Sequence, residues 1–399
     1  MRADNTDARI PESVPFDHQS PTRVVFGVNS VGQVGQLASE LGARNVLLVT
    51  DNGIVKAGHA AYVQSLLEAA AINVARFDQV EENPSTACVE SCVRVARQFG
   101  VDTILGLGGG SSMDTAKGAN FILTNGGRMQ DYWGIGKAKS PMLPFIAIPT
   151  TGGTGSECQS FALITDEQTH QKMACGDPKA AARIAILDPA LTVSQPPRVT
   201  ACSGIDAIAH SVETAVTRKR NPLSLMFSRE AFRLTMAGFP RVLKEPTDIE
   251  ARGWMLLGAA WSGTAIENSM LGAAHSAANP LTARFGIVHG HAVGLMLPHV
   301  VRFNAQDAVT AARYAEIAYA AHLANPSEPI QFAVGRLADC LQQLLREARL
   351  PVSLQQCGVQ EPDLARLAAE ATTQWTAQFN PRPVTAADFQ ALFGAALAA

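Results

Sequence analysis

The chain has 399 residues, enough for about two to three domains, and its 47% hydrophobic and 17% charged residues are typical of a folded globular protein. The chain has 32 basic and 35 acidic residues, which gives a formal net charge of −3. This balance predicts no broad basic surface and so argues against nucleic acid as a partner. The seven cysteines include no CxxC pair, which argues against a disulfide framework or a four-thiolate zinc site and favours a reducing compartment. No stretch holds about 18 consecutive apolar residues, so we expect no membrane span and a cytoplasmic protein.

Residues 1–22 mix charged residues, proline and polar residues without an apolar centre, so they predict a flexible extension and not a signal peptide. From 23 to 195, short apolar runs alternate with amphipathic stretches of helical periodicity. The runs predict strands within 23–27, 45–51, 72–77, 101–110, 144–150 and 182–189. Runs that are apolar almost throughout fit a parallel sheet covered by helices on both faces.

Residues 196–399 have a different character. Pro196 and Pro197 lie in a polar stretch that marks a boundary, because neither can continue a helix or a central strand. After them, helical periodicity appears in four long segments, 199–216, 222–242, 248–268 and 309–323, and no convincing strand follows. The predicted fold class is therefore α/β plus all-α, with a sheet domain at 23–195 and an all-helical domain at 196–399.

The segment TILGLGGGSSMDTAK (103–117) predicts a strand, a glycine turn and the start of a helix. Gly108, Gly109 and Gly110 would let the backbone approach a ligand closely, and Ser111 or Ser112 can cap a helix whose free N–H groups point at an anion. This pattern predicts a pyrophosphate cradle. It is not the GxGxxG fingerprint, and it comes about a hundred residues into the chain, so a plain tight turn is the alternative.

Two other segments support a nucleotide site. Asp51 ends a predicted strand, where its carboxylate would accept both ribose hydroxyls and repel a 2′-phosphate, which favours NAD over NADP. The alternative is that Asp51 caps the turn that follows. The segment IPTTGGTGSE (148–157) places Thr150, Thr151 and Thr154 in a small loop after a strand, where their hydroxyls can bind a nicotinamide amide or a phosphate. A purely structural loop is the alternative.

The second half contains a candidate metal site. Asp206 and His210 lie four residues apart on a predicted helix, hence on one face. Residues 271–301 then hold four of the chain's nine histidines: His275, His289, His291 and His299. One carboxylate and three imidazoles suit Fe(II), Zn(II), Ni(II) or Co(II) and leave a position open for a substrate oxygen. For any single histidine a place in the core is the alternative, so the cluster carries the prediction.

This series of motifs resembles the iron-containing, or group III, alcohol dehydrogenase family. The resemblance covers nearly the whole chain after the first twenty residues, and the motifs come in the family's order: GGGSSMDTAK, IPTTGGTGSE, DPALT, GIDAIAHSVE, NSMLGAAHSAANP, IVHG and LPHV. It implies a Rossmann-like dinucleotide-binding domain, a C-terminal helical domain, the dehydroquinate-synthase-like fold and an active-site cleft between the two domains. Relatives commonly form homodimers or larger homo-oligomers.

The resemblance also assigns site residues. It implies a divalent metal, with Fe(II) as the first candidate, held by Asp206, His210, His275 and His289. It implies NAD bound by eleven residues: Asp51, Gly108, Gly109, Gly110, Ser111, Ser112, Asp114, Thr150, Thr151, Thr154 and Lys172. Lys172 is expected in a polar turn before the last strand, with its ammonium near a ribose hydroxyl.

One position departs from the family pattern. Many relatives have a second histidine four residues after the third ligand, whereas this chain has Asn279, which cannot exchange a proton near neutral pH. His291 is the expected catalytic substitute, with a core or supporting role as the alternative.

The predicted function is a metal-dependent alcohol dehydrogenase or aldehyde reductase that transfers hydride between a small alcohol and NAD, with the metal as Lewis acid. The alternatives are a hydroxyacid–oxoacid transhydrogenase with tightly bound NAD and a non-catalytic nucleotide-binding module. Dehydroquinate-synthase-like elimination ranks lower, because it needs a strongly basic pocket and the metal segments offer only Arg284.

Overall fold

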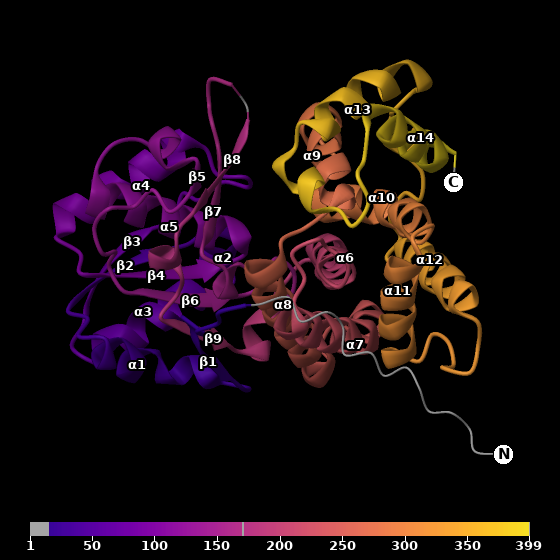
Figure 1. The fold of residues 1–399 in the computed structure, drawn as a ribbon. Helices are drawn as coiled ribbons and strands as arrows, with labels where there is room; N and C mark the ends of the chain where they lie inside the picture. The colour runs from indigo at the N-terminus through magenta and orange to yellow at the C-terminus, as the bar shows by residue number, and fades with distance from the viewer. Residues whose placement is uncertain (1–15, 170, 399) are drawn as a thin grey trace.

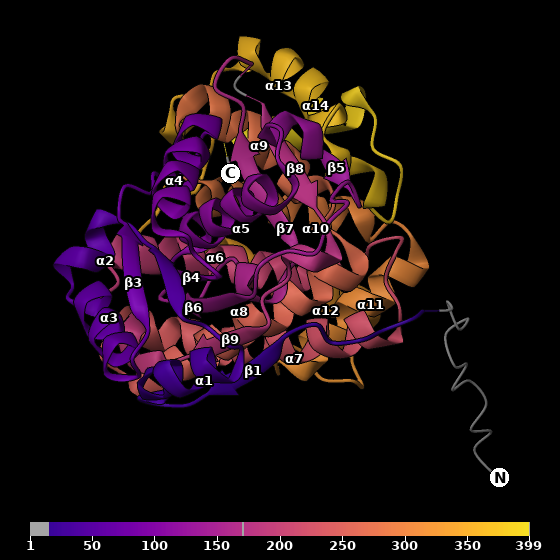
Figure 2. The same ribbon diagram turned by 90° about the vertical axis from the view of Figure 1, so that its left-hand side faces the viewer.

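The computed structural model describes residues 16–169 and 171–398, so most of the predicted extension at 1–22 lies outside the described residues. Two halves of the chain lie side by side, with the sheet in one half and a group of helices in the other, and α8 (Ile249–Ser269) lies between them (Figure 1). Figure 2 shows the helical half behind the sheet when the molecule is turned.

The first half is built on a six-stranded sheet in which every neighbouring pair is parallel and the strand order is β1-β9-β6-β4-β2-β3. Its strands are β1 (Arg23–Phe26), β2 (Asn45–Val49), β3 (Asn73–Phe77), β4 (Thr103–Gly108), β6 (Phe145–Pro149) and β9 (Ile184–Leu187). All six predicted strands are confirmed. Strands β4, β6 and β9 are buried along their whole length, which explains why their sequences are apolar without alternation.

Helices cover both faces of this sheet. They are α1 (Val34–Glu40), α2 (Asn52–Lys56), α3 (His59–Ala69), α4 (Thr86–Phe99) and α5 (Gly110–Asn125). On β2, Leu47 and Val49 pack with α4 and α5, whereas Val46 and Leu48 pack with α1 and α3. Successive side chains of a strand point to opposite faces, so this division follows from the strand geometry.

A second, three-stranded sheet was not predicted from the sequence. It contains β5 (Gly134–Ile135), β8 (Lys172–Gly176) and β7 (Phe161–Thr165), in that order, and β7 pairs with β8 in the antiparallel sense. The prediction that Lys172 lies in a polar turn is therefore wrong, because it is the first residue of β8, opposite Thr165. The strands have only two to five residues, so local composition alone did not distinguish them from a loop.

The second half is helical, and after Leu187 the described residues contain no further strand. Its helices are α6 (Pro197–Thr214), α7 (Pro222–Lys244), α8 (Ile249–Ser269), α9 (Ala273–Phe285), α10 (His289–Asn304), α11 (Ala308–Ala320), α12 (Ile330–Glu347), α13 (Leu364–Thr372) and α14 (Ala386–Leu397). Helix α6 begins with Pro197, where its missing N–H costs no hydrogen bond.

The two halves are joined by close packing of α8. Leu256 and Ala260 of α8 form one apolar cluster with Ala185 and Leu187 of β9. Gly155 has φ +62, and a Cβ there would lie 2.3 Å from the Ala259 carbonyl oxygen, so the loop after β6 can contact α8 only through a glycine.

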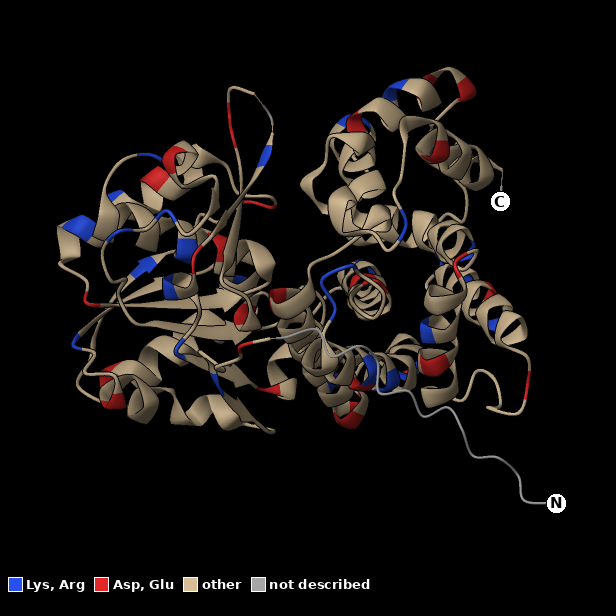
Figure 3. Cartoon of the chain, viewed as in Figure 1, with Lys and Arg blue, Asp and Glu red and all other residues tan. Residues whose placement is uncertain are grey.

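Charged residues are spread over both halves, with Lys and Arg interspersed among Asp and Glu in the view of Figure 3. Within the part of the chain that the structure describes, no helix is long and apolar enough to cross a membrane.

Candidate metal and nucleotide site

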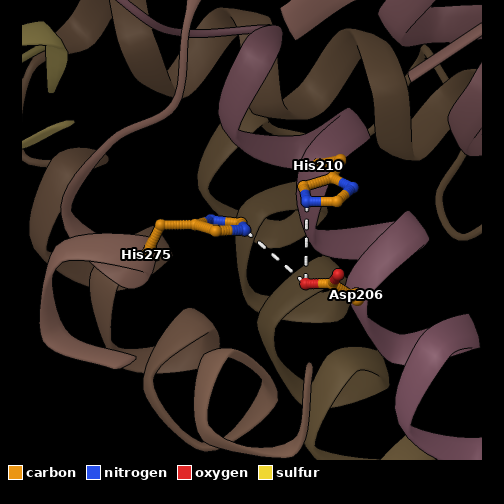
Figure 4. Close-up of side chains that lie close together, drawn as sticks. All are labelled: Asp206, His210 and His275. Atoms are coloured by element: carbon orange, nitrogen blue, oxygen red, sulfur yellow. Dashed lines mark ion pairs between the residues drawn. The ribbon is translucent and has the colours of Figure 1, made fainter. Parts of the chain in front are cut away.

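Three of the four predicted metal ligands form a compact buried group. Asp206 and His210 lie one turn apart on α6, and His275 lies in the first turn of α9 (Figure 4). The Asp206 Oδ1 atom is 3.6 Å from His210 Nε2 and 3.6 Å from His275 Nε2. One potential ligand atom from each residue lies within 4.8 Å of the other two.

The donor atoms of this group fit a divalent cation. Asp206 Oδ1 and His275 Nε2 are buried and have no hydrogen-bond partner among the described residues. Their separation of 3.6 Å is too long for a good hydrogen bond, but two ligands that share one ion, each at about 2.0–2.2 Å, lie at such a separation. Buried polar atoms without partners are rare because they cost free energy, so a bound ion explains why these two are present.

His289 lies beside the group, at the start of α10. Its ring centroid is 5.4 Å from that of His275, whereas the rings of His210 and His275 are 4.9 Å apart. Burial lowers the pKa of His289 to about 3, against the attraction of Asp206 and with help from the ammonium of Lys172. Burial alone would raise the pKa of the Asp206 carboxyl, but the surrounding imidazoles, first that of His210, lower it well below its ordinary value. These shifts keep Asp206 ionised and His289 neutral, the forms that bind metals.

Glu213 orients His275, and the sequence analysis did not single it out. Its Oε2 atom accepts a hydrogen bond from His275 Nδ1 at 2.5 Å and one from the backbone N–H of Gly272 at 3.1 Å. Its Oε1 atom accepts the backbone N–H of Ala274 at 2.7 Å. Because a carboxylate only accepts, Nδ1 carries a proton, and Nε2 is the ring nitrogen that is directed toward Asp206 and available as a metal ligand. The signal was present in the sequence, since Glu213 lies seven residues after Asp206 on the same helix face.

The charge of Glu213 also sets the protonation of its partner. Burial disfavours the charged form of His275, yet Glu213 and Asp206 outweigh it and raise the pKa of His275 to about 9. In the absence of a cation this imidazole therefore holds a proton, which a metal ion would displace.

Two further predicted residues lie elsewhere. His291 Nε2 is 2.8 Å from the carbonyl oxygen of Pro351, and its ring lines a separate cavity with Arg198 and Arg349. The structure does not bring it into the compact group. Asn279 donates to the side-chain oxygen of Gln374 at 2.9 Å.

The glycine cradle forms as predicted from strand, turn and helix. Gly108, at the end of β4, has φ +144, and a Cβ there would lie 2.4 Å from the Ser112 hydroxyl. A Cβ on Gly110 would lie 2.8 Å from Thr154, and one on Gly109 would lie 3.5 Å from Thr151. Helix α5 begins at Gly110 and has no side-chain cap, so its first N–H groups are free for an anion.

Asp51 lies next to this cradle, and its two carboxylate oxygens have different surroundings. Its Oδ1 atom accepts the backbone N–H groups of Gly53 at 2.7 Å and Ile54 at 3.1 Å, which caps α2 as the alternative interpretation predicted. Its Oδ2 atom faces the cradle, 3.3 Å from where a Cβ on Gly108 would lie. The capping role and a ribose-binding role use different oxygens of one carboxylate.

Asp114 and Thr150 lie deeper than the predicted nucleotide-binding surface. Thr150 is buried and its backbone N–H donates to Gly108 at 2.9 Å. Asp114 accepts a hydrogen bond from the hydroxyl of Ser156 at 3.1 Å. Burial raises the pKa of Asp114 to about 6, although Lys117 and a second lysine oppose the shift.

Lys117 completes this buried polar cluster and was missed by the sequence analysis. Its ammonium is buried and donates to the Ser156 carbonyl at 2.6 Å, to the Ser156 hydroxyl at 2.9 Å and to the Phe161 carbonyl at 3.0 Å. Lys117 thereby ties the helix of the glycine cradle to the loop after β6 and to β7. Its place three residues after Asp114 in the same motif was the available signal.

The cradle and the ligand group are neighbours. A Cβ on Gly153, in the threonine loop, would lie 2.5 Å from Ser203, one turn before Asp206 on α6. Lys172 donates to the Asn83 side chain at 3.1 Å, and burial lowers its pKa while the carboxylates of Asp114 and Asp206 oppose that shift. Lys172 therefore lies within electrostatic reach of both halves of the site. Together these features define a protein with a nucleotide-type cradle on a parallel sheet and a candidate metal site on the adjoining helices.

Comparisons with known proteins agree with this class. The family described as "Iron-containing alcohol dehydrogenase" matches residues 21–189, and "Fe-containing alcohol dehydrogenase family, C-terminal" matches residues 200–397. Alcohol dehydrogenase 4 of Schizosaccharomyces pombe is 34% identical over 94% of this chain and 88% of its own length. The NAD-dependent methanol dehydrogenase of Bacillus methanolicus is 32% identical over 94% of this chain and 98% of its own length. The crystal structure of a 1,3-propanediol oxidoreductase, 30% identical, has a TM-score of 0.92 and covers 96% of this chain and 100% of its own.

The chain belongs to the iron-containing alcohol dehydrogenase family. It is an oxidoreductase that interconverts alcohols and aldehydes, and the predicted family, fold class and general reaction are confirmed.

Proposed function

We propose that this enzyme uses NAD and one divalent ion, with Fe(II) as the first candidate, to oxidise small primary alcohols and to reduce the corresponding aldehydes. The observation that carries the proposal is the pair of buried, unpartnered atoms, Asp206 Oδ1 and His275 Nε2, beside a glycine cradle. A non-catalytic nucleotide-binding module would have no use for the first of these features.

The metal would be held by Asp206, His210, His275 and His289. This set of one oxygen and three nitrogens suits first-row divalent ions. A bound ion would act as a Lewis acid toward the substrate oxygen, and NAD would accept the hydride. Burial of Asp206, His210 and His275 excludes water and so strengthens the electrostatic interactions among them.

The cofactor would lie across the cradle. Free N–H groups at the start of α5 would bind the pyrophosphate, because the glycines leave room and the helix dipole favours an anion. Oδ2 of Asp51 would accept ribose hydroxyls and repel a 2′-phosphate, and the ammonium of Lys172 would donate to the second ribose. The name of the methanol dehydrogenase relative, which includes NAD dependence, supports the same cofactor.

The test is a panel of alcohols and aldehydes assayed with NAD(H) and NADP(H) after anaerobic reconstitution with Fe(II), Zn(II), Ni(II) or Co(II). Metal content is measured in parallel on wild type, Asp206→Asn and the surface control Asp339→Asn, whose side chain is 71% exposed. We expect one ion per chain in wild type and in the control, and loss of both metal and activity in Asp206→Asn. Activity that is indifferent to chelation, or equal metal content in all three proteins, would contradict the proposal.

A further inference from the structure

One face of the β7–β8 hairpin carries both a charged and an apolar region. In the antiparallel register, Phe161 lies opposite Gly176, Leu163 opposite Ala174, and Thr165 opposite Lys172. Residues that lie opposite each other, and residues two apart, point to the same face. Phe161, Leu163 and Ala174 therefore share a face with Lys172, whereas the alternating residues of both strands are part of the core of the sheet half.

This face is covered by two segments of the helical half. We call the resulting cluster the apolar wall, and it consists of Phe161, Leu163, Ala174, Met270, Trp375 and Phe379. The rings of Phe161 and Trp375 are stacked with centroids 5.9 Å apart, and Phe379 meets Trp375 edge-on at 5.8 Å. Leu163, Trp375 and Phe379 remain partly exposed, so the wall still presents apolar surface.

The wall lies next to the candidate metal site. Trp375 belongs to the short helix η8 (Trp375–Phe379), and the residue after it, Thr376, is hydrogen-bonded to Ser276 at 2.7 Å. Ser276 directly follows His275 on α9. At the other end of the wall, Lys172 on the same hairpin face acts electrostatically on Asp206. Through the contact of Thr376 with Ser276, the apolar wall lies near the ligand group.

Met270 holds a backbone conformation that favours glycine. It lies between α8 and α9, five residues before His275, with φ 67 and ψ −175. Only glycine adopts this region without strain. The methionine side chain is nevertheless buried in the apolar wall, with 7% of its surface exposed. A methionine occupies this position although glycine would relieve the backbone strain. This indicates that the methionine side chain has a function here.

Nearby polar groups are paired with each other. Asn279 donates to Gln374, and Arg284 forms an ion pair with Glu370, so the charge of this arginine is already balanced by a carboxylate of the chain. Lys219 lies over the Phe379 ring at 4.9 Å and is exposed, at the outer rim of the wall. The chemistry of the wall is therefore that of hydrocarbon, thioether and aromatic groups.

We infer that Met270 is a specificity-determining residue for the proposed alcohol oxidation. The apolar wall receives the hydrocarbon tail of the alcohol or aldehyde, and the Met270 side chain limits the length of tail that fits. The inference rests on the proposed function and adds the substrate class, unbranched apolar alcohols without a carboxylate.

The test compares kcat/KM for 1-alkanols from ethanol to 1-octanol in wild type and Met270→Gly. Each additional buried methylene contributes about fourfold to binding, so space for two more should raise the octanol-to-ethanol ratio about 15-fold. Glycine relieves the backbone strain at this position but removes a buried side chain, so the melting temperature of the variant is measured first to establish that it folds. Met226→Ala is the control, because Met226 is 57% exposed on α7 and should leave the ratio unchanged.

A binding measurement separates the two hypotheses. Titration of 1-hexanol should change the tryptophan fluorescence of wild type saturably, and the change should disappear in Trp375→Phe. If wild type oxidises alcohols but Met270→Gly leaves the chain-length profile unchanged, the inference is wrong and the proposed function stands. If wild type oxidises no alcohol, the proposed function fails, and the inference falls with it even where hexanol still binds at Trp375.

Discussion

Replacing Glu213 by glutamine tests whether this carboxylate prepares the candidate metal site. Three N–H groups donate to its two oxygens: those of His275, Gly272 and Ala274. A glutamine of the same shape has one oxygen and one NH₂ group. If its oxygen faces His275 and Gly272, the Ala274 N–H meets a second donor; if the amide is turned over, the other two donors do. At least one buried N–H loses its acceptor in either orientation.

Two effects of different size follow. An unsatisfied buried N–H costs about 1–3 kcal/mol, so the metal-free Glu213→Gln protein should be less stable by that amount. Loss of a carboxylate that orients a ligand histidine typically weakens metal binding about 10–100-fold, or about 1.4–2.8 kcal/mol. The imidazole of His275 would also lose the partner that most favours its proton-donating Nδ1 tautomer.

The assay is a metal titration against a competing chelator, combined with urea unfolding of the metal-free protein. Glu267→Gln is the matched control, because Glu267 accepts the Ser160 backbone N–H at 3.0 Å and its hydroxyl at 2.5 Å but contacts no imidazole. We expect both variants to lose stability and only Glu213→Gln to lose metal affinity. A metal dissociation constant within about threefold of wild type in folded Glu213→Gln would refute the reasoning.

Three other substitutions probe separate features. Asp51→Asn should keep the cap of α2, because asparagine caps a helix as well as aspartate does. It should raise the ratio of kcat/KM with NADP to kcat/KM with NAD about tenfold or more, because the charge that repels a 2′-phosphate is lost. An unchanged ratio in steady-state kinetics would contradict the ribose-binding role. Burial raises the pKa of Glu157 from 4.5 to about 7, so the folded state binds a proton more tightly than the unfolded state and stability should fall, by up to about 3 kcal/mol, as pH rises from 4.5 to 7. Urea unfolding at pH 5 and pH 8 should show a smaller fall in Glu157→Gln than in wild type or in the exposed control Glu90→Gln, and equal falls would overturn the assignment. Gly155→Ala should cost about 3 kcal/mol or more, because its Cβ would meet a carbonyl oxygen of α8 at 2.3 Å. The control Gly136→Ala, with φ +72 and nothing within 4 Å of its Cβ, should cost only the left-handed strain of about 1–2 kcal/mol. Urea unfolding of both variants compares the two losses, and equal losses would show that the contact with α8 is unimportant.

Local patterns were sufficient for the larger sheet, the helical half and the cradle. Apolar runs identified all six parallel strands because a strand buried on both faces must be apolar throughout. The glycines of 108–110 identified the turn into α5, because a side chain on Gly108 or Gly110 would collide with Ser112 or Thr154. The four-residue spacing of Asp206 and His210 placed both on one face of α6, since a helix repeats every 3.6 residues.

Other features required contacts between distant parts of the chain. His291 is only two residues from His289, yet it bonds to Pro351, because successive positions of a helix point in different directions. The β7–β8 hairpin was missed because its strands are stabilised by α5 on one side and by Trp375, about two hundred residues away, on the other. Nothing in the local sequence marks Met270 as strained.

The sequence alone was therefore enough to predict which segments form strands or helices and which side chains can bind a phosphate or a metal ion. Packing of α6 against α9 decided that Glu213 meets His275 and that Asp206 and His275 leave two buried atoms without partners. Packing of η8 against β7 decided which apolar groups border them. Such pairings depend on the summed burial of many side chains across the two halves, which no window of neighbouring residues contains.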